Sequence, residues 1–171
     1  PDFQVTWKQD RLLGLLQEAG GVQPEAILPP LQGGSWNYRR RARMSVRYVR
    51  QKGRVVLGFR ERDGRYVADL QECHVLHPAV ARYLPELSEV LDSLEARESI
   101  PQIEICCGDE SGALIVRHLR DLQPADQERL RSFARESGLA VLLQSGGVET
   151  VRPLEPAEPR LEYRLPAFDL A

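Results

Sequence analysis

The chain has 171 residues, of which 42% are hydrophobic, and its 23 Lys and Arg against 25 Asp and Glu give a formal net charge of −2. This length suits about one domain, and three cysteines are too few for a disulfide framework. We see neither an apolar run long enough to span a membrane nor a signal peptide, and therefore expect a cytoplasmic protein without a membrane partner.

The first predicted element is an amphipathic helix, residues 1–21. Asp2 can cap its start, a Gly-Gly pair can end it, and the leucines between them form a broad apolar stripe. Such a stripe needs a partner, so we expect this helix to pack on a further, catalytic domain. Residues 22–37 are rich in proline and glycine and form a predicted connector, in which Trp36 is expected to anchor the core of the domain that follows.

A strongly basic stretch follows, residues 38–65. It holds 11 Lys and Arg against two acids, a local charge of +9, which leaves −11 for the rest of the chain. Because such an uneven distribution is typical of a surface that meets a polyanion, the stretch predicts contact with nucleic acid. The alternative is a sheet face whose arginines are only solvated.

The basic stretch alternates as strands do. In the run at 42–48, apolar residues occupy one side, and the other side carries Arg43 and Arg47. A short turn leads to a second alternating run at 54–60, and an Asp-Gly hairpin signal leads to a third at 66–68. The pattern predicts a three-stranded antiparallel meander with one apolar and one arginine-rich face.

The rest of the predicted central domain, residues 38–154, mixes helices and strands. Pro85 interrupts an amphipathic pattern at 80–94, so it either kinks one helix or begins a second one after a short helical piece. Another helix is predicted over about 125–137. Further strand patterns occur at 101–107, 113–119, 139–143 and 149–154. These elements predict an α+β fold, a mostly antiparallel sheet with two or three packed helices, followed by a linker into the next domain at 155–171.

Catalytic motifs are not visible in the chain. It contains neither a nucleophile elbow nor a phosphate-binding glycine loop, so no catalytic residue is assigned. Cys73, His74 and His77 offer too few ligands, at poor spacing, for a closed zinc site, and His77 suits a helix cap better. Cys106 and Cys107 are neighbours on a predicted strand, so they should point to opposite faces as small structural side chains.

Three short segments carry a resemblance to a known family: Tyr-Arg-Arg-Arg-Ala-Arg at 38–43, Gly-Phe-Arg at 58–60 and Asp-Leu-Gln-Glu-Cys at 69–73. The chain resembles the central part of bacterial 23S ribosomal RNA (uracil-5-)-methyltransferases, most specifically over residues 36–73. The resemblance implies a fragment, inactive alone, of an enzyme that uses S-adenosylmethionine to methylate C5 of a uridine in ribosomal RNA. In that family the central domain holds a [4Fe-4S] cluster.

The same resemblance implies residue roles and partners. Cys73 matches a cluster ligand, but the other ligands, the nucleophile and the cofactor-binding domain of the family lie outside this chain. We therefore expect neither the cluster nor S-adenosylmethionine to be bound here. Ribosomal RNA is the expected partner, and no obligate protein partner is predicted. The arginines expected to contact RNA are Arg39, Arg40, Arg41, Arg43, Arg47, Arg54 and Arg60.

Two other functions remain open from the sequence. The first is a stand-alone RNA-binding α+β module without any tie to methylation. The second is the related transfer-RNA uracil-5-methyltransferase, which lacks the cluster, so the presence of Cys73 in its sequence context favours the ribosomal type.

Overall fold

The computed structural model of the chain describes residues 2–164. The chain divides into two units, with the boundary between Ser35 and Trp36. The first unit contains α1 (Asp2–Gly20), in which no side chain is buried, and then a stretch without helix or strand. Within the described residues, we find no helix that combines the length and apolar character needed to cross a membrane.

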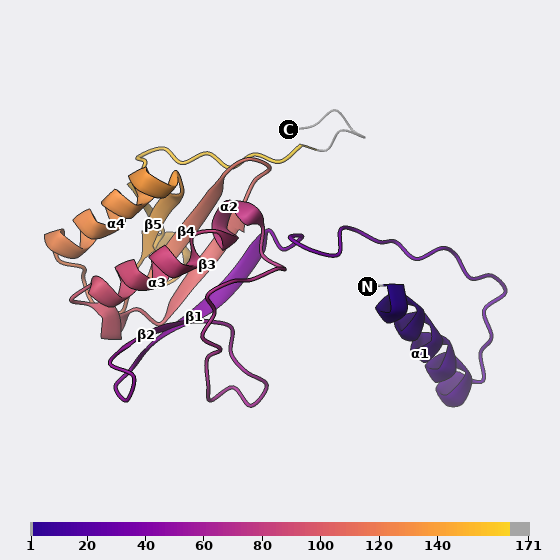
Figure 1. Cartoon of the computed structure of the whole chain (residues 1–171). Helices are drawn as coiled ribbons and strands as arrows, with labels where there is room; N and C mark the ends of the chain where they lie inside the picture. Colours follow the sequence, from indigo (N-terminus) through magenta and orange to yellow (C-terminus); the bar gives the residue numbers. More distant parts are fainter. Residues whose placement is uncertain (1, 165–171) are drawn as a thin grey trace. The chain divides into compact units, whose positions relative to one another are not determined.

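The second unit is built on a six-stranded sheet, shown in Figure 1. The strand order is β2-β1-β3-β4-β5-β6, and neighbouring strands are antiparallel except for β4 and β5. The strands are β1 (Arg41–Val49), β2 (Arg54–Gly58), β3 (Gln102–Cys107), β4 (Gly112–Arg117), β5 (Ala140–Gln144) and β6 (Arg152–Glu155). This mostly antiparallel sheet with packed helices confirms the predicted α+β class.

The helices of this unit are α2 (Pro78–Ala81), α3 (Leu84–Ser93) and α4 (Pro124–Ser137), with 3-10 turns η1 (Arg97–Ser99) and η2 (Val148–Thr150). Pro85 lies in the first turn of α3, where its missing N–H removes no helical hydrogen bond. A short helix therefore precedes a longer one, as the second alternative for this region predicted. α4 ends at Gly138, whose φ of 71° forms a left-handed cap. The α4 crossover allows β4 and β5 to run parallel.

The core lies between the helices and one face of the sheet. Figure 1 shows α3 and α4 on the same face. Side chains that alternate along the strands pack there against the apolar stripes of the helices. The largest fully buried side chains of the core are Met44, Leu57, Leu76, Leu84, Leu87, Leu91, Leu94, Ile100, Ile103, Ile105, Leu114 and Leu130. The alternate residues of the strands therefore point away from this core.

The predicted third strand of the meander is wrong. Residues 66–70 pair with residues 57–61 through three backbone hydrogen bonds and the isolated bridge between Arg60 and Val67, but no strand forms there. This segment passes close over the end of β2, where a Cβ atom placed on Gly58 would lie 1.7 Å from the carbonyl oxygen of Ala68. Only glycine allows this close approach of two backbone segments. The Arg-rich element is therefore a two-stranded hairpin with a folded-back loop.

Candidate nucleic-acid interface

The basic stretch lies largely on the sheet face that points away from the core. Between Arg41 and Arg47 of β1 the apolar residues are buried, whereas Arg41, Arg43 and Arg47 are exposed. The predicted division of this strand into an apolar and a cationic side is confirmed. We call the surface the open face. It consists of Arg41, Arg43, Ser45 and Arg47 of β1, Gln102, Glu104 and Cys106 of β3, Ile115 and Arg117 of β4, and Leu142 and Gln144 of β5.

Two of the nominated arginines share one carboxylate on the open face. Glu104 of β3 accepts hydrogen bonds from Arg41 at 3.1 and 2.8 Å, and it lies 3.8 Å from a guanidinium nitrogen of Arg43. The hydrogen bond to Glu104 is the main reason that the pKa of Arg41 is raised. Both arginine side chains are still mostly exposed, at 78% and 66%. Because exposed ion pairs contribute little free energy, a phosphate can compete with Glu104 for either arginine.

Arg54 is held more firmly, at the start of β2. Two of its guanidinium nitrogens donate to the carboxylate of Asp69, at 3.2 and 2.5 Å, and Lys52 reaches the same carboxylate at 3.2 Å. The Arg54 hydrogen bond, assisted by Lys52, lowers the pKa of Asp69 below its usual value, even though partial burial acts in the opposite direction. This forked pair ties the folded-back loop to β2, so Arg54 has a structural role in this unit.

The lowered pKa of Asp69 predicts a specific acid dependence. A carboxylate whose folded pKa lies below its unfolded value stabilises the fold above the unfolded pKa, about 3.9 for Asp, and loses this contribution as the pH falls through the folded pKa. The Asp69→Asn variant should therefore be less stable than the parent chain at pH 7, and the gap should narrow as the pH falls below the unfolded pKa and through the lower folded pKa of Asp69. Urea unfolding at pH 7 and across the acidic range measures this. An exposed control, Asp121→Asn, should show no such gap.

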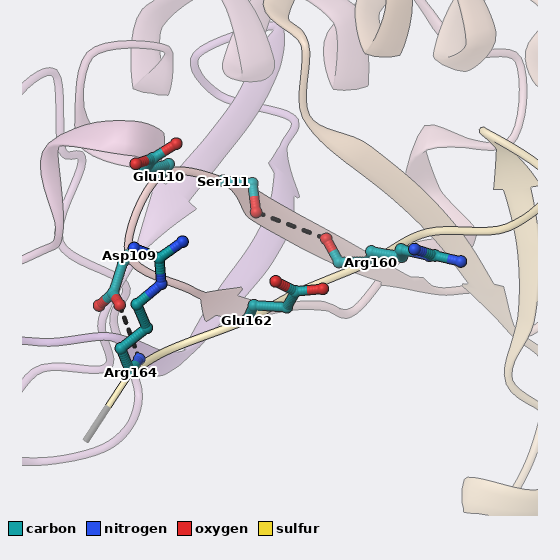
Figure 2. Close-up of a pocket in the computed structure, with 6 residues that line it drawn as sticks. All are labelled: Asp109, Glu110, Ser111, Arg160, Glu162 and Arg164. Carbon is teal, nitrogen blue, oxygen red and sulfur yellow. Dashed lines mark hydrogen bonds between the residues drawn. The ribbon is translucent and has the colours of Figure 1, made fainter. Parts of the chain in front are cut away.

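Arg40 also has an internal partner. Its guanidinium donates to the carbonyl oxygen of Gly108 and lies 2.9 Å from a carboxylate oxygen of Asp109, both in the turn between β3 and β4. Asp109 in turn accepts a 2.8 Å hydrogen bond from the Arg164 N–H, and its own N–H donates to the Glu162 carbonyl. Figure 2 shows Asp109 beside Arg164 in a shallow pocket lined by residues of both segments. Arg40 therefore supports the turn that holds the C-terminal segment, residues 156–164.

Removing the Asp109 carboxylate should release this C-terminal segment. The Asp109→Ala variant loses the bond to the Arg164 N–H and the ion pair with Arg40. A charge-assisted hydrogen bond at a partly exposed site should slow opening by about five- to tenfold. We therefore expect hydrogen exchange at Arg164 and tryptic cleavage after Arg160 to be faster by about this factor. The neighbouring exposed Glu110→Ala serves as the control, and equal rates in both variants would contradict the assigned role.

Each of the remaining nominated arginines links the β1 side of the sheet to the folded-back loop, residues 59–70. The guanidinium of Arg39 lies 5.6 Å from the centre of the Phe59 ring. Arg47 donates to the Arg65 carbonyl at 2.8 Å, and Arg60 donates to the Ser45 hydroxyl at 3.3 Å. Among residues 2–164, none of Arg39, Arg47 and Arg60 forms an ion pair with a carboxylate. Their charge is therefore available to an anionic ligand.

The surroundings of Cys73 do not form a metal site in the described part of the chain, where no group of three or more potential ligands occurs. Cys73 is half-buried against the core. His77 caps α2 by accepting from the Ala79 N–H at 3.3 Å, as its position suggested. The expected core role of Trp36 is wrong, because the side chain is 61% exposed and meets the His74 ring edge-on.

Sequence reasoning also overlooked Arg117. It lies at the end of β4 on the open face, with no carboxylate within ion-pair distance among residues 2–164. The strand pattern held the signal, because Arg117 alternates with the buried Val116 and therefore had to point away from the core.

Almost the whole chain is similar in sequence to curated proteins. Proteins named 23S rRNA (uracil(1939)-C(5))-methyltransferase RlmD are 49% identical to the chain in Xylella fastidiosa, 46% in Alkalilimnicola ehrlichii and 42% in Xanthomonas oryzae pv. oryzae. These alignments cover 97–99% of the chain. The chain is homologous to a segment of these methyltransferases. This confirms the resemblance inferred from residues 36–73.

The chain spans 38% of the length of these curated relatives. The similarity therefore concerns one part of these relatives. No family model matches the chain.

Proposed function

We propose that this chain is the RNA-holding part of a 23S rRNA uracil-C5 methyltransferase. The observation that carries the proposal is the arginine-rich β1 in a chain that is 49% identical to an enzyme of that name. The substrate of the whole protein is then ribosomal RNA, and the cytoplasm is its site of action. The curated relatives cited above have the ribosomal name, so nothing favours the transfer-RNA alternative.

The seven nominated arginines divide into two groups under this proposal. Arg39, Arg41, Arg43, Arg47 and Arg60 contact RNA, since their charge is unpaired or paired only on the exposed surface. Arg40 and Arg54 hold the turn and the loop in place, and so shape the surface rather than bind to it. The planar guanidinium donates to phosphate oxygens and can also stack on an unpaired base.

The chemical step requires groups beyond this chain. In uracil C5 methylation a cysteine thiolate attacks C6 of the base, and S-adenosylmethionine supplies the methyl group. Burial raises the pKa of Cys107 to about 11, and burial also raises the pKa of Cys106. A thiol that stays protonated at neutral pH is a poor nucleophile. This supports the proposal that the catalytic residues lie elsewhere in the whole protein and that the chain alone is inactive.

A [4Fe-4S] cluster does not fit the residues of this chain that the structure describes. Such a cluster takes four thiolates, and Cys73 is accompanied by no group of potential ligands in residues 2–164. We propose that Cys73 serves as one ligand in the whole protein only. Iron and sulfide analysis of the purified chain tests this, since stoichiometric iron would contradict it.

The ends of the chain are proposed to connect the central domain to the catalytic domain of the whole protein. α1 has an apolar stripe and no buried side chain, so we propose that it packs on the catalytic domain. Residues 22–37 connect it to the central domain, and residues 155–171 lead into the catalytic domain. Deleting residues 1–21 should then leave the unfolding of the central domain unchanged.

A salt titration tests the RNA-holding role. The chain is titrated into a labelled single-stranded fragment of 23S rRNA between low and high salt. With about four phosphate contacts, the slope of log K against log salt should be roughly −3. Binding that does not change with salt, or no binding at low salt, would overturn the proposal.

A further inference from the structure

A row of polar side chains crosses the open face at right angles to the strands. The strand register pairs Ser45 with Gln102, Gln102 with Arg117, and Arg117 with Gln144. These four residues therefore lie side by side on β1, β3, β4 and β5. Since neighbouring strands are about 4.8 Å apart, the row is about 14 Å long.

The row has unused hydrogen-bonding capacity. Gln102, Arg117 and Gln144 are half-buried, and within residues 2–164 their side chains form neither hydrogen bonds nor ion pairs. Ser45 accepts one bond, from Arg60. Two amides and a guanidinium together offer both donors and acceptors. This combination suits the edge of a nucleobase, which also presents both.

An apolar pair lies directly beside the polar row. Ile115 of β4 is in register with Leu142 of β5, and both are half-buried on the open face. An unstacked base has a flat apolar face as well as a polar edge. The apolar pair therefore matches the face of a base, and the polar row matches its edge. A duplex keeps its bases stacked and paired, so it could use only the charges of this surface.

The charge of the open face identifies the kind of partner. It carries the cations Arg41, Arg43, Arg47 and Arg117 against a single acid, Glu104, which Arg41 and Arg43 already share. A second copy of this chain would bring the same positive charge to the interface, which disfavours self-association through this face. A polyanion is the complementary partner.

We propose that the open face binds unpaired nucleotides of RNA, with the bases over Ile115 and Leu142 and their edges against Gln102, Arg117 and Gln144. The inference rests on the proposed function and extends the RNA surface from β1 across β3, β4 and β5.

The test uses the intact chain and a 12-nucleotide single-stranded RNA, with the same RNA annealed into a duplex for comparison. The row variant combines Gln102→Ala, Arg117→Gln and Gln144→Ala, and so loses one charge. The control variant combines Arg82→Gln and Gln123→Ala and also loses one charge. Both residues are exposed and lie away from the open face, Arg82 at the end of α2 and Gln123 at the start of α4. The row variant should bind the single strand at least about tenfold more weakly, while the control stays within about twofold.

Crosslinking of the unmodified chain gives a readout that does not depend on how the variants fold. RNA containing 4-thiouridine should crosslink to peptides of β3, β4 or β5. If the chain binds RNA in a salt-dependent way but the row variant matches the control and crosslinks avoid these strands, the inference is wrong and the proposed function stands. If the chain does not bind RNA at all, both fail. A dimer that Leu142→Arg dissociates without changing RNA affinity would make the face a protein interface and overturn the inference.

Discussion

Replacing Arg39, Arg47 and Arg60 together by Gln should weaken binding of single-stranded RNA by about 30-fold at low salt. These arginines have no carboxylate partner among residues 2–164, and each links the β1 side of the sheet to the folded-back loop. If each contacts one phosphate, the slope of log K against log salt should become shallower by about 2, because each contact contributes about 0.7 for a single strand. Fluorescence anisotropy at several salt concentrations measures both quantities.

A matched variant removes the same charge from the helical side of the unit. Arg82→Gln, Arg131→Gln and Arg135→Gln lie on α4 and next to α2, away from the open face. If RNA responded only to net charge, this variant would lose as much affinity as the first. Equal losses would therefore contradict a localised RNA surface, and a loss confined to the first variant would support it.

Periodicity predicted most of the sheet because each strand has one buried face. On β3 every second residue is buried, and on β4 the same alternation holds from Leu114 to Arg117, so the sequence alone indicated both strands and their orientation. The same rule located the cationic side of β1. Pro85 and Gly138 correctly indicated the first turn of α3 and the end of α4, because the backbone preferences of proline and glycine act locally.

The failures concern contacts between residues that are distant in sequence. The partner of Arg54 is Asp69, across a loop that had been predicted as a strand, and the partner of Arg40 is Asp109, 69 residues away. A count of charges cannot reveal such pairs. The composition of the basic stretch therefore overestimated the number of arginines that are free to bind RNA. Trp36 was misjudged because hydrophobicity does not specify which side of the connector faces the core.

Asp126 is another residue whose role was invisible in the sequence, and its removal should cost the most stability. It lies in the first turn of α4 with 0% exposure. Its carboxylate accepts from the N–H groups of Glu95 and Ala96, at 2.9 and 3.0 Å, and from Arg129 at 3.0 Å. The chain after α3 is thereby fixed to the start of α4, which no pattern of hydrophobicity could indicate.

The Asp126→Ala variant leaves the N–H groups of Glu95 and Ala96 without their acceptor. Each hydrogen bond to a charged group contributes about 1.5–3 kcal/mol, so we expect a loss of about 3 kcal/mol or more in the free energy of unfolding. Asp126→Asn keeps one acceptor oxygen and should lose about half as much. Urea unfolding of both variants, with exposed Asp121→Ala as the control, measures the effect. If Asp126→Ala unfolded at the same urea concentration as the control, the carboxylate would not be what joins the two helices.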